Sequence, residues 1–533
     1  MLALFACLPF IVAFTLFSFK IRSWIISFIT LYVTCLLAEG VFGASVRDLL
    51  PPLASGSVMA MKILIIIGPA FLFYFIEEKI GAVRYFTAAL MRLCPEREIL
   101  VLVIVLGVSP FLEALCGFGT GLIVALPVLL VLGLSPIRVA LLSILGEITT
   151  AWASMGNAAT LEAAISGTNA HLLGMDTALL LIPLTLGSAV LALFLSGGRE
   201  ALCRKGCMAV LAGGLLAGSE WGLSWLVGVD LAGLCASLLV LGALLGYAHL
   251  RPHRDPLQAH LTVSKHGQKT ERQWKMIVPG AFLLSSLLVV HLFPLPLPLL
   301  HATAIWLCAA CIWGIICTPQ RWNILPEVGR SLWKRLFPIA ATILGCVLAS
   351  AVMQGTGMID ALSHEAEMLG QVYLWVVPLL GGLGAWMTNS NVGSNALFAP
   401  MHVEMAQHAS LNLTWLSAAQ NASASIGRLL APSCLLLAAS SGISESSLFR
   451  WVSPIVFLAL AGCELVLSIV FLQSGASSLV WVIAWSLLFI LGGSLFLFRV
   501  SRLPLKQNCE QASVRMKFGA RRKQAQRSAG SPG

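Results

Sequence analysis

Long apolar stretches dominate the chain and are separated by short polar, mostly basic segments. A helix that crosses a bilayer needs about 20 consecutive apolar residues. Continuous rather than alternating hydrophobicity favours such helices over a membrane barrel. The pattern predicts single spans near residues 2–19, 24–42, 57–75, 178–196, 207–228, 230–248, 276–293, 299–317, 337–356, 450–472 and 479–498.

Two longer apolar blocks are each interrupted by polar, glycine-rich sequence. Block 99–164 contains S-P-F-L-E-A-L-C-G-F-G-T-G at 109–121, and block 372–439 contains T-N-S-N-V-G-S-N-A-L-F at 388–398. Lipid does not tolerate unsatisfied backbone, so such breaks line a cavity or are buried in protein. Matching breaks in two halves point to a transport site. We therefore expect an all-α polytopic membrane protein of about 12–14 membrane segments, with two inverted structural repeats and broken or re-entrant helices.

Basic segments divide the chain and favour the cytoplasmic side of a membrane. The charged stretch from Glu77 to Glu98 is expected to be an interfacial helix, and 321–335 a basic amphipathic connector. The predicted divisions are 1–248, a first transmembrane half; 249–275, a basic cytoplasmic linker; 276–498, a second transmembrane half; and 499–533, a basic cytoplasmic tail.

Composition supports the membrane class and argues against others. Of the 533 residues, 58% are hydrophobic and only 11% are charged, against about 25% charged residues in a soluble protein. The net charge of +10 collects between apolar runs, where it sets membrane orientation rather than nucleic-acid binding. No basic segment precedes the first run, which therefore reads as a span and not a signal peptide. We expect no metal, no cofactor and no enzymatic activity, because Cys308 and Cys311 lack a second ligand pair and no catalytic constellation is visible.

Three of the ionisable residues inside the broken blocks are the candidates for chemistry. A charge at the bilayer centre costs at least about 2.5–3.5 kcal/mol, so Glu113, Glu147 and Arg428 are functional candidates. Either carboxylate can carry a coupled proton; alternatively, Glu113 caps freed backbone N–H groups and Glu147 holds a neighbouring helix. The guanidinium of Arg428 suits a substrate carboxylate. The alternatives for Arg428 are an ion pair with one of these glutamates, or snorkelling to an interface.

The two breaks also offer neutral hydrogen-bonding groups to an anion. We expect short helices to start after Gly119 and Gly393, with their positive dipole ends facing the substrate. The predicted substrate-binding residues are Gly117, Gly119, Thr120, Asn389, Ser390, Asn391, Ser394, Asn395, Asn421 and Arg428.

Several of these segments resemble the L-lactate permease family. E-A-L-C-G-F-G-T resembles the family's E-x-x-x-G-F-G-T, and T-N-S-N-V-G-S-N-A-L-F-A resembles T-x-S-D-x-x-S-N-A-L-F-G. A-A-Q-N-A-S-A-S-I-G-R-L-L-A-P and S-L-F-R resemble the next two family segments in order and spacing. The resemblance implies a proton symporter that imports L-lactate or related 2-hydroxy monocarboxylates, such as glycolate and D-lactate, across the plasma (inner) membrane. It also implies re-entrant hairpins and an elevator-like motion.

The chain departs from the family pattern at four places. One is the family's asparagine-containing segment in the first half, which is replaced around Gly146 and Glu147. Asn391 stands where the family has Asp, Arg428 where it has Lys, and Gly121 where Pro is common. A Na⁺-coupled symporter, or a carrier of another organic anion, with the same fold therefore remains an alternative. The partners implied are a monocarboxylate, a proton and the lipid bilayer, without nucleic acid. Assembly as a homodimer, and the identity of the proton-carrying glutamate, stay open.

Overall fold

The computed structural model of the protein is helical and has no β-strand among the residues that it describes. These are residues 2–19, 21–82, 89–90, 93–94, 96–117, 119–250, 278–292, 303–316, 321–472 and 479–503. Ten helices are long and apolar enough to cross a membrane, and the bent pair Pro136–Leu145 and Thr150–Ser166 is an eleventh candidate. Three shorter helices are also apolar: Leu2–Leu16, Thr120–Val131 and Ala304–Ile316. The predicted all-α polytopic class is confirmed.

The described helices occur along the chain in the following order. The first half contains α1 (Leu2–Ser18), α2 (Ser23–Gly40), α3 (Val46–Ile80), α5 (Arg97–Val103), α6 (Ser109–Cys116), α7 (Thr120–Val131), α8 (Pro136–Leu145), α9 (Ala153–Ser166), α10 (Ala170–Leu226) and α11 (Val229–Leu250). The second half contains α12 (Val278–Leu292), α13 (Thr303–Ile316), α14 (Arg321–Gly355), α15 (Met358–Ala366), α16 (Tyr373–Thr388), α17 (Asn391–His408), α18 (Leu413–Arg428), α19 (Pro432–Ala439), α20 (Glu445–Leu472) and α21 (Leu479–Ser501).

Two predicted boundaries need correction. The basic segment 321–335 is not a separate connector, because it continues into the following span as α14, which packs against α2 and α3. By contrast, the two spans predicted at 178–196 and 207–228 lie within α10 on either side of a break at Gly198, where φ is 70° and ψ is −155°. Glu77 belongs to the last turns of α3, since that helix ends only at the left-handed Gly81. In both corrected cases the helix extends beyond the predicted boundary, because helix formation continues along the chain until a residue ends it.

Some predictions fall outside the described residues. They concern most of the linker (251–275), most of the basic tail (504–533) and much of the interfacial segment (83–88, 91–92 and 95). The cytoplasmic location of the linker and tail stays a prediction.

The helix breaks have specific backbone causes. Gly117 and Gly119 have φ of 75° and 80°, a region that favours glycine, and α7 starts directly after them. A Cβ on Gly117 would lie 2.1 Å from Ser154 Oγ. In the second half, α17 starts at Asn391 rather than after Gly393, because Ser390 Oγ accepts from the Gly393 N–H and caps the helix there.

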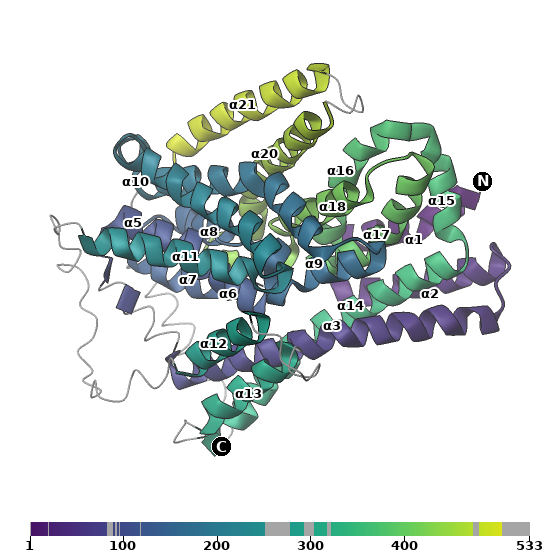
Figure 1. The fold of residues 1–533 in the computed structure, drawn as a ribbon, viewed down its shortest axis with the longest axis horizontal. Coiled ribbons are helices and arrows are strands. Elements are labelled where there is room, and N and C mark those ends of the chain that lie inside the picture. The colour runs from purple at the N-terminus through teal and green to yellow at the C-terminus, as the bar shows by residue number, and fades with distance from the viewer. Residues whose placement is uncertain are drawn as a thin grey trace, which may run out of the picture.

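The two sets of broken helices pack reciprocally. In the first half α9 packs on α17 of the second half, and α19 of the second half packs on α7 of the first. Such an exchange is expected of two repeats related by a two-fold axis. Figure 1 shows α2, α3 and α14 along one side of the molecule and α20 and α21 along the other, with the broken helices between them.

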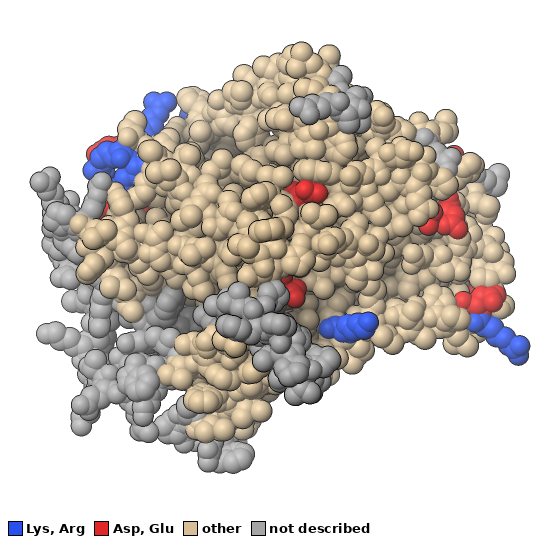
Figure 2. Space-filling view, in the orientation of Figure 1, with Lys and Arg blue, Asp and Glu red and all other residues tan. Residues whose placement is uncertain are grey.

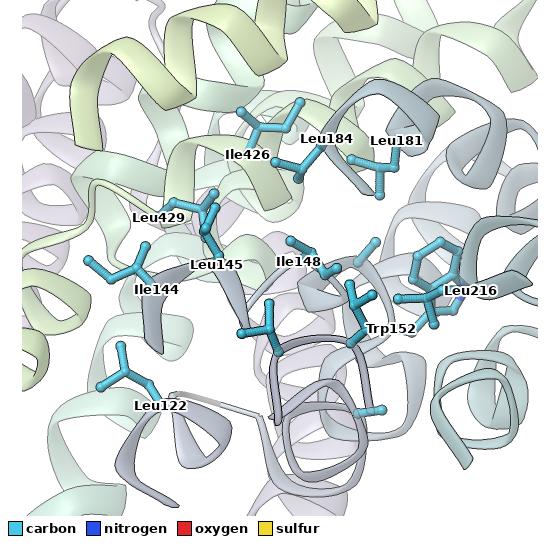
Figure 3. Packing of buried hydrophobic residues seen from close by; sticks show 14 of the residues in the cluster. Leu122, Ile144, Leu145, Ile148, Trp152, Leu181, Leu184, Leu216, Ile426 and Leu429 are labelled. Carbon is cyan, nitrogen blue, oxygen red and sulfur yellow. The ribbon is translucent and has the colours of Figure 1, made fainter. Parts of the chain in front are cut away.

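The outer surface is apolar and the core joins both halves. Figure 2 shows a face on which charged side chains are few, with several of them gathered at two edges. Many large apolar residues of α20 and α21 are exposed, as a lipid-facing surface requires. Figure 3 shows buried side chains of the core from both halves: Leu122, Leu145 and Ile148 from the first, and Ile426 and Leu429 from the second.

Candidate functional site

A buried arginine joins two buried glutamates where the two halves of the chain meet. Arg428 Nη2 lies 3.0 Å from Glu113 Oε1, and Arg428 Nη1 donates to Glu147 Oε2 at 3.1 Å. Both carboxylates are fully buried, and Arg428 is only 5% exposed. Glu113 comes from α6, Glu147 from the break after α8, and Arg428 is the last residue of α18. We call these three residues the charge centre.

The remaining carboxylate oxygens of the charge centre bind the start of α7. Glu113 Oε2 accepts from the Gly119 N–H at 2.9 Å, and Glu147 Oε1 accepts from the Leu122 N–H at 2.8 Å. The first N–H groups of a helix lack partners within the helix and attract negative charge. The chain's own glutamates therefore fill the helix start that the sequence predicted for a substrate anion.

The two contacts of Arg428 differ in quality. Its contact with Glu147 is a well-formed hydrogen bond. Glu113 Oε1 is equally close, but it has no hydrogen bond of acceptable direction. This oxygen thus retains an unused lone pair beside the guanidinium.

Apolar side chains pack beside the charge centre, and Arg335 of α14 also interacts electrostatically with its three residues. Ile148 and Leu429 adjoin Glu147 and Arg428 in sequence, and Leu122 lies at the start of α7; all three are buried in the common core (Figure 3). Low polarity strengthens attraction between charges and penalises any charge left without a partner. Arg428 consequently stabilises the charge of each glutamate, and the two glutamates stabilise the charge of Arg428.

A set of buried amides lies between α9, α17 and α18. Asn391 Nδ2 donates to Ser425 Oγ at 2.9 Å and to Thr150 O at 3.2 Å. Asn395 Nδ2 donates to Asn421 Oδ1 and to the Ala158 carbonyl, both at 3.0 Å. Asn391 Oδ1 is buried without a hydrogen-bond partner. Of the predicted neutral groups, these amides form the connected set that reaches α18.

Other predicted site residues make local structural bonds. Thr120 Oγ1 donates to the Leu112 carbonyl, and Ser394 Oγ donates to the Gly381 carbonyl. Asn389 Oδ1 accepts from the N–H and the hydroxyl of Ser433, at the start of α19. These contacts stabilise the backbone at the helix breaks, and none of them involves Arg428.

The structure also reveals buried polar residues that the sequence reasoning missed. Tyr373 Oη and His402 Nδ1 are 2.7 Å apart, and His402 Nε2 lies 3.0 Å from Gln420 Oε1. Gln420 Nε2 in turn donates to Ser394 Oγ at 3.0 Å. Glu162 on α9 is fully buried as well. The available signal was the rule already used for Glu113, because Glu162 and His402 are also ionisable residues within the two broken blocks.

We expect Asn391→Asp to lower stability at neutral pH and to regain it as the pH falls. The Asn391 amide donates to the Thr150 carbonyl, which a protonated acid can also do but a carboxylate cannot. The neutral form therefore fits the folded protein, and acidification restores it. The measurement is thermal unfolding of the detergent-purified protein at acidic and neutral pH.

The matched control is Asn389→Asp. The Asn389 side chain accepts hydrogen bonds from the Ser433 N–H and hydroxyl, so a carboxylate preserves them and suits the start of α19. This variant is expected to unfold like the wild type at both pH values. Equal behaviour of the two variants would contradict the donor role of the Asn391 amide.

A bundle of membrane-spanning helices, with paired breaks around a buried charge centre, defines a multi-pass membrane transporter. The profile described as L-lactate permease matches residues 2–309 and 295–473, which is most of the chain. The chain therefore belongs to the L-lactate permease family, a family of permeases and not of enzymes. The resemblance predicted from the sequence motifs is confirmed.

Named relatives agree with this family. The chain is 27% identical over 449 residues to an L-lactate permease of Streptococcus iniae, covering 78% of this chain and 93% of that protein. It is 23% identical over 521 residues to the L-lactate permease of Escherichia coli, covering 86% and 94%. A 125-residue segment is 32% identical to the glycolate permease GlcA of Escherichia coli, covering 22% of each chain. A solved structure, the Alcanivorax borkumensis YdaH transporter, superposes with a TM-score of 0.47 at 14% identity, covering 84% of this chain and 98% of that one.

Proposed function

We propose that this protein imports L-lactate or a related 2-hydroxy monocarboxylate, such as glycolate or D-lactate, by proton symport across the cell (inner) membrane. The observation that carries the proposal is the position of Arg428 between Glu113 and Glu147 in a member of the L-lactate permease family. The names of its relatives, lactate and glycolate permeases, support the substrate class.

The charge centre suggests how proton and substrate are coupled. With both glutamates ionised, the three residues carry a net charge of −1. A proton on one glutamate weakens its hold on Arg428 and frees one edge of the guanidinium, which then binds the substrate carboxylate. The added proton and the added anion cancel, so the loaded centre again carries −1. Empty and loaded forms therefore place the same charge in the membrane interior, and neither is excluded by the electrostatic penalty.

The neighbouring amides supply a partner for the 2-hydroxyl group. Ser425 precedes Arg428 by three positions on α18, so the two share one face about 5–6 Å apart, and Ser425 holds Asn391. The unpartnered Asn391 Oδ1 can accept a hydrogen bond from a hydroxyl next to the bound carboxylate. We assign Asn391 to hydroxyl recognition, with Asn395 and Asn421 holding it in place.

Each half of the chain contributes a part of this proposed site. The first half, within 1–248, supplies both carboxylates and the start of α7; the second, within 276–498, supplies Arg428 and the amides. We propose that relative movement of these two sets of broken helices exposes the site alternately to the two sides, with the linker and tail on the cytoplasmic side.

Uptake by proteoliposomes tests the proposed function. Purified protein is reconstituted, an inward proton gradient is imposed, and labelled lactate or glycolate uptake is followed with and without sodium. We expect sodium-independent accumulation that a protonophore abolishes, with competition by glycolate and less by acetate, which lacks the hydroxyl. Accumulation that ignores the proton gradient would refute proton coupling, and sodium dependence would favour the Na⁺-coupled alternative. Absence of uptake for every monocarboxylate would refute the substrate class.

A further inference from the structure

Glu162 is a buried acid that the charge centre does not use. It lies on α9 with no exposed surface, and neither carboxylate oxygen has a hydrogen-bond partner. The Ser417 hydroxyl on α18 is close enough to interact with the carboxylate, but its direction completes no hydrogen bond. An ionised carboxylate without a cation or donors costs several kcal/mol in a protein interior. In this conformation the side chain is therefore held as the neutral acid.

The groups around Glu162 offer it no counter-charge. Among the described ion pairs none involves Glu162, since Arg428 is engaged by Glu113 and Glu147. Tyr373 is its electrostatic neighbour, and that hydroxyl is bonded to His402. Helices that contact α9 carry cations such as Lys79 and Lys205, which pair with Glu327 and Glu96. They also carry buried or partly buried titratable residues, among them Glu77, Glu113, Asp176, Glu220, Asp230, His402, Glu404 and Arg428. Of these, Asp230 bonds Thr160, and Glu404 lies near His408.

A continuous polar face of α18 connects Glu162 with the charge centre. Its members recur at helical spacing and are all buried: Ser417, Gln420, Asn421, Ser425 and Arg428. Ser417 faces Glu162 at one end, and Arg428 binds Glu113 and Glu147 at the other. The eleven-residue separation corresponds to about 16 Å along the helix. Between the ends, the Asn391, Asn395 and Gln420 side chains link α18 to α17 by hydrogen bonds.

We propose that Glu162 is a second proton-binding site of this transporter, loaded and unloaded once in each cycle. The proposal rests on the proposed symport and extends it. An acid kept only for packing would not leave both oxygens without donors, because each unsatisfied buried group costs about 1–3 kcal/mol. Glu162 also follows a strained break, in which Ser154, Met155 and Gly156 are left-handed. A change in this break moves α9 and offers the acid new partners, which lets its proton leave.

The proposal predicts a net charge movement. Two protons accompany one monocarboxylate anion, so each cycle carries one positive charge inward. An inside-negative membrane potential, set with valinomycin and potassium at equal pH, is then expected to drive lactate accumulation by wild-type protein. For one net charge the limit is about tenfold for each 59 mV of potential. Glu162→Gln removes the second proton, so it is expected to keep uptake driven by a pH gradient and to lose the response to potential.

Glu464→Gln is the matched control. Glu464 on α20 is another buried acid, 2% exposed and with one unpartnered oxygen, but it lies outside the polar face of α18. This variant is expected to respond to potential like the wild type. The second site would be overturned if Glu162→Gln kept the wild-type response to membrane potential. It would also be overturned if wild-type protein that accumulates lactate in a pH gradient did not respond to potential. Either outcome leaves the proposed symport intact.

Infrared spectroscopy gives a readout that does not depend on transport. Wild-type protein is expected to show a carbonyl stretch of a protonated carboxylic acid that disappears in Glu162→Gln and persists in Glu464→Gln. If Glu162→Gln fails to fold, Ser417→Ala is used instead and is expected to shift the same band, because it changes the neighbour of the acid. A band that none of these variants affects would overturn the proposal, even if no monocarboxylate were transported.

Discussion

Replacing Arg428 with glutamine is expected to abolish monocarboxylate uptake and to lower the free energy of unfolding by about 3–5 kcal/mol, the usual effect of removing one partner from a buried ion pair. Arg428 forms ion pairs with both Glu113 and Glu147. Without it, two fully buried carboxylates face each other across the start of α7. Uptake in proteoliposomes and chemical unfolding in detergent measure the two effects.

Compensating variants separate the loss of stability from the loss of binding. Adding Glu113→Gln to Arg428→Gln removes one of the stranded charges, so we expect part of the stability to return while uptake stays absent. Arg428→Lys restores the residue found in the family motif and is expected to transport with weaker affinity, since an ammonium cannot form the two-pronged contact. Uptake by Arg428→Gln with unchanged affinity would remove Arg428 from the substrate site.

Arg138→Gln is the control for burial of an arginine as such. Arg138 is 1% exposed, and its guanidinium donates to the Leu195 and Leu503 carbonyls at 2.7 and 2.8 Å. Its loss is expected to lower stability without changing the dependence of uptake on the proton gradient. Parallel effects of the two arginine variants on coupling would indicate that the Arg428 phenotype reports general destabilisation.

The sequence predicted which residues form the site better than it predicted the contacts between them. Glu113, Glu147 and Arg428 stood out because a charge in an apolar block is rare and costly, and glycines marked the break before α7. The partners of these charges were not predictable in the same way. The Leu122 N–H that binds Glu147 has no sequence signature, since any non-proline residue offers the same donor. Only the folded arrangement decides that α7 is capped by glutamates instead of a ligand.

In the second half of the chain, sequence-based prediction failed for a different reason. Local capping by Ser390 moved the start of α17 ahead of Gly393, although glycine content suggested the later position. His402 and Gln420 bond across α17 and α18, a pairing that no helical periodicity within one segment encodes. Glu162 was accessible to the same reasoning as Glu113, but flanking alanines made its surroundings look like ordinary packing sequence.

The two glutamates of the charge centre are expected to differ in their effect on coupling. Glu113 Oε1 faces Arg428 without a hydrogen bond. Both oxygens of Glu147, by contrast, accept hydrogen bonds, one from Arg428 and the other from the Leu122 N–H. We therefore assign the symported proton to Glu113. Glu113→Gln fixes this position in a neutral state, so exchange of labelled for unlabelled lactate is expected to persist. Accumulation driven by a pH gradient is expected to fall to about the level reached without a gradient, because the proton-linked step is lost.

Glu147→Gln is the matched comparison for Glu113→Gln. It makes the same change in charge at the glutamate whose two oxygens both accept hydrogen bonds. Its loss removes the hydrogen bond that orients Arg428, so we expect weaker lactate affinity with accumulation still dependent on the proton gradient. The two variants are compared by exchange and by gradient-driven uptake in the same proteoliposome preparation. If Glu147→Gln loses gradient dependence while Glu113→Gln keeps it, the proton resides on Glu147. If both keep it, the coupling proton does not bind at the charge centre, and Glu162 becomes the sole candidate among the buried acids discussed above.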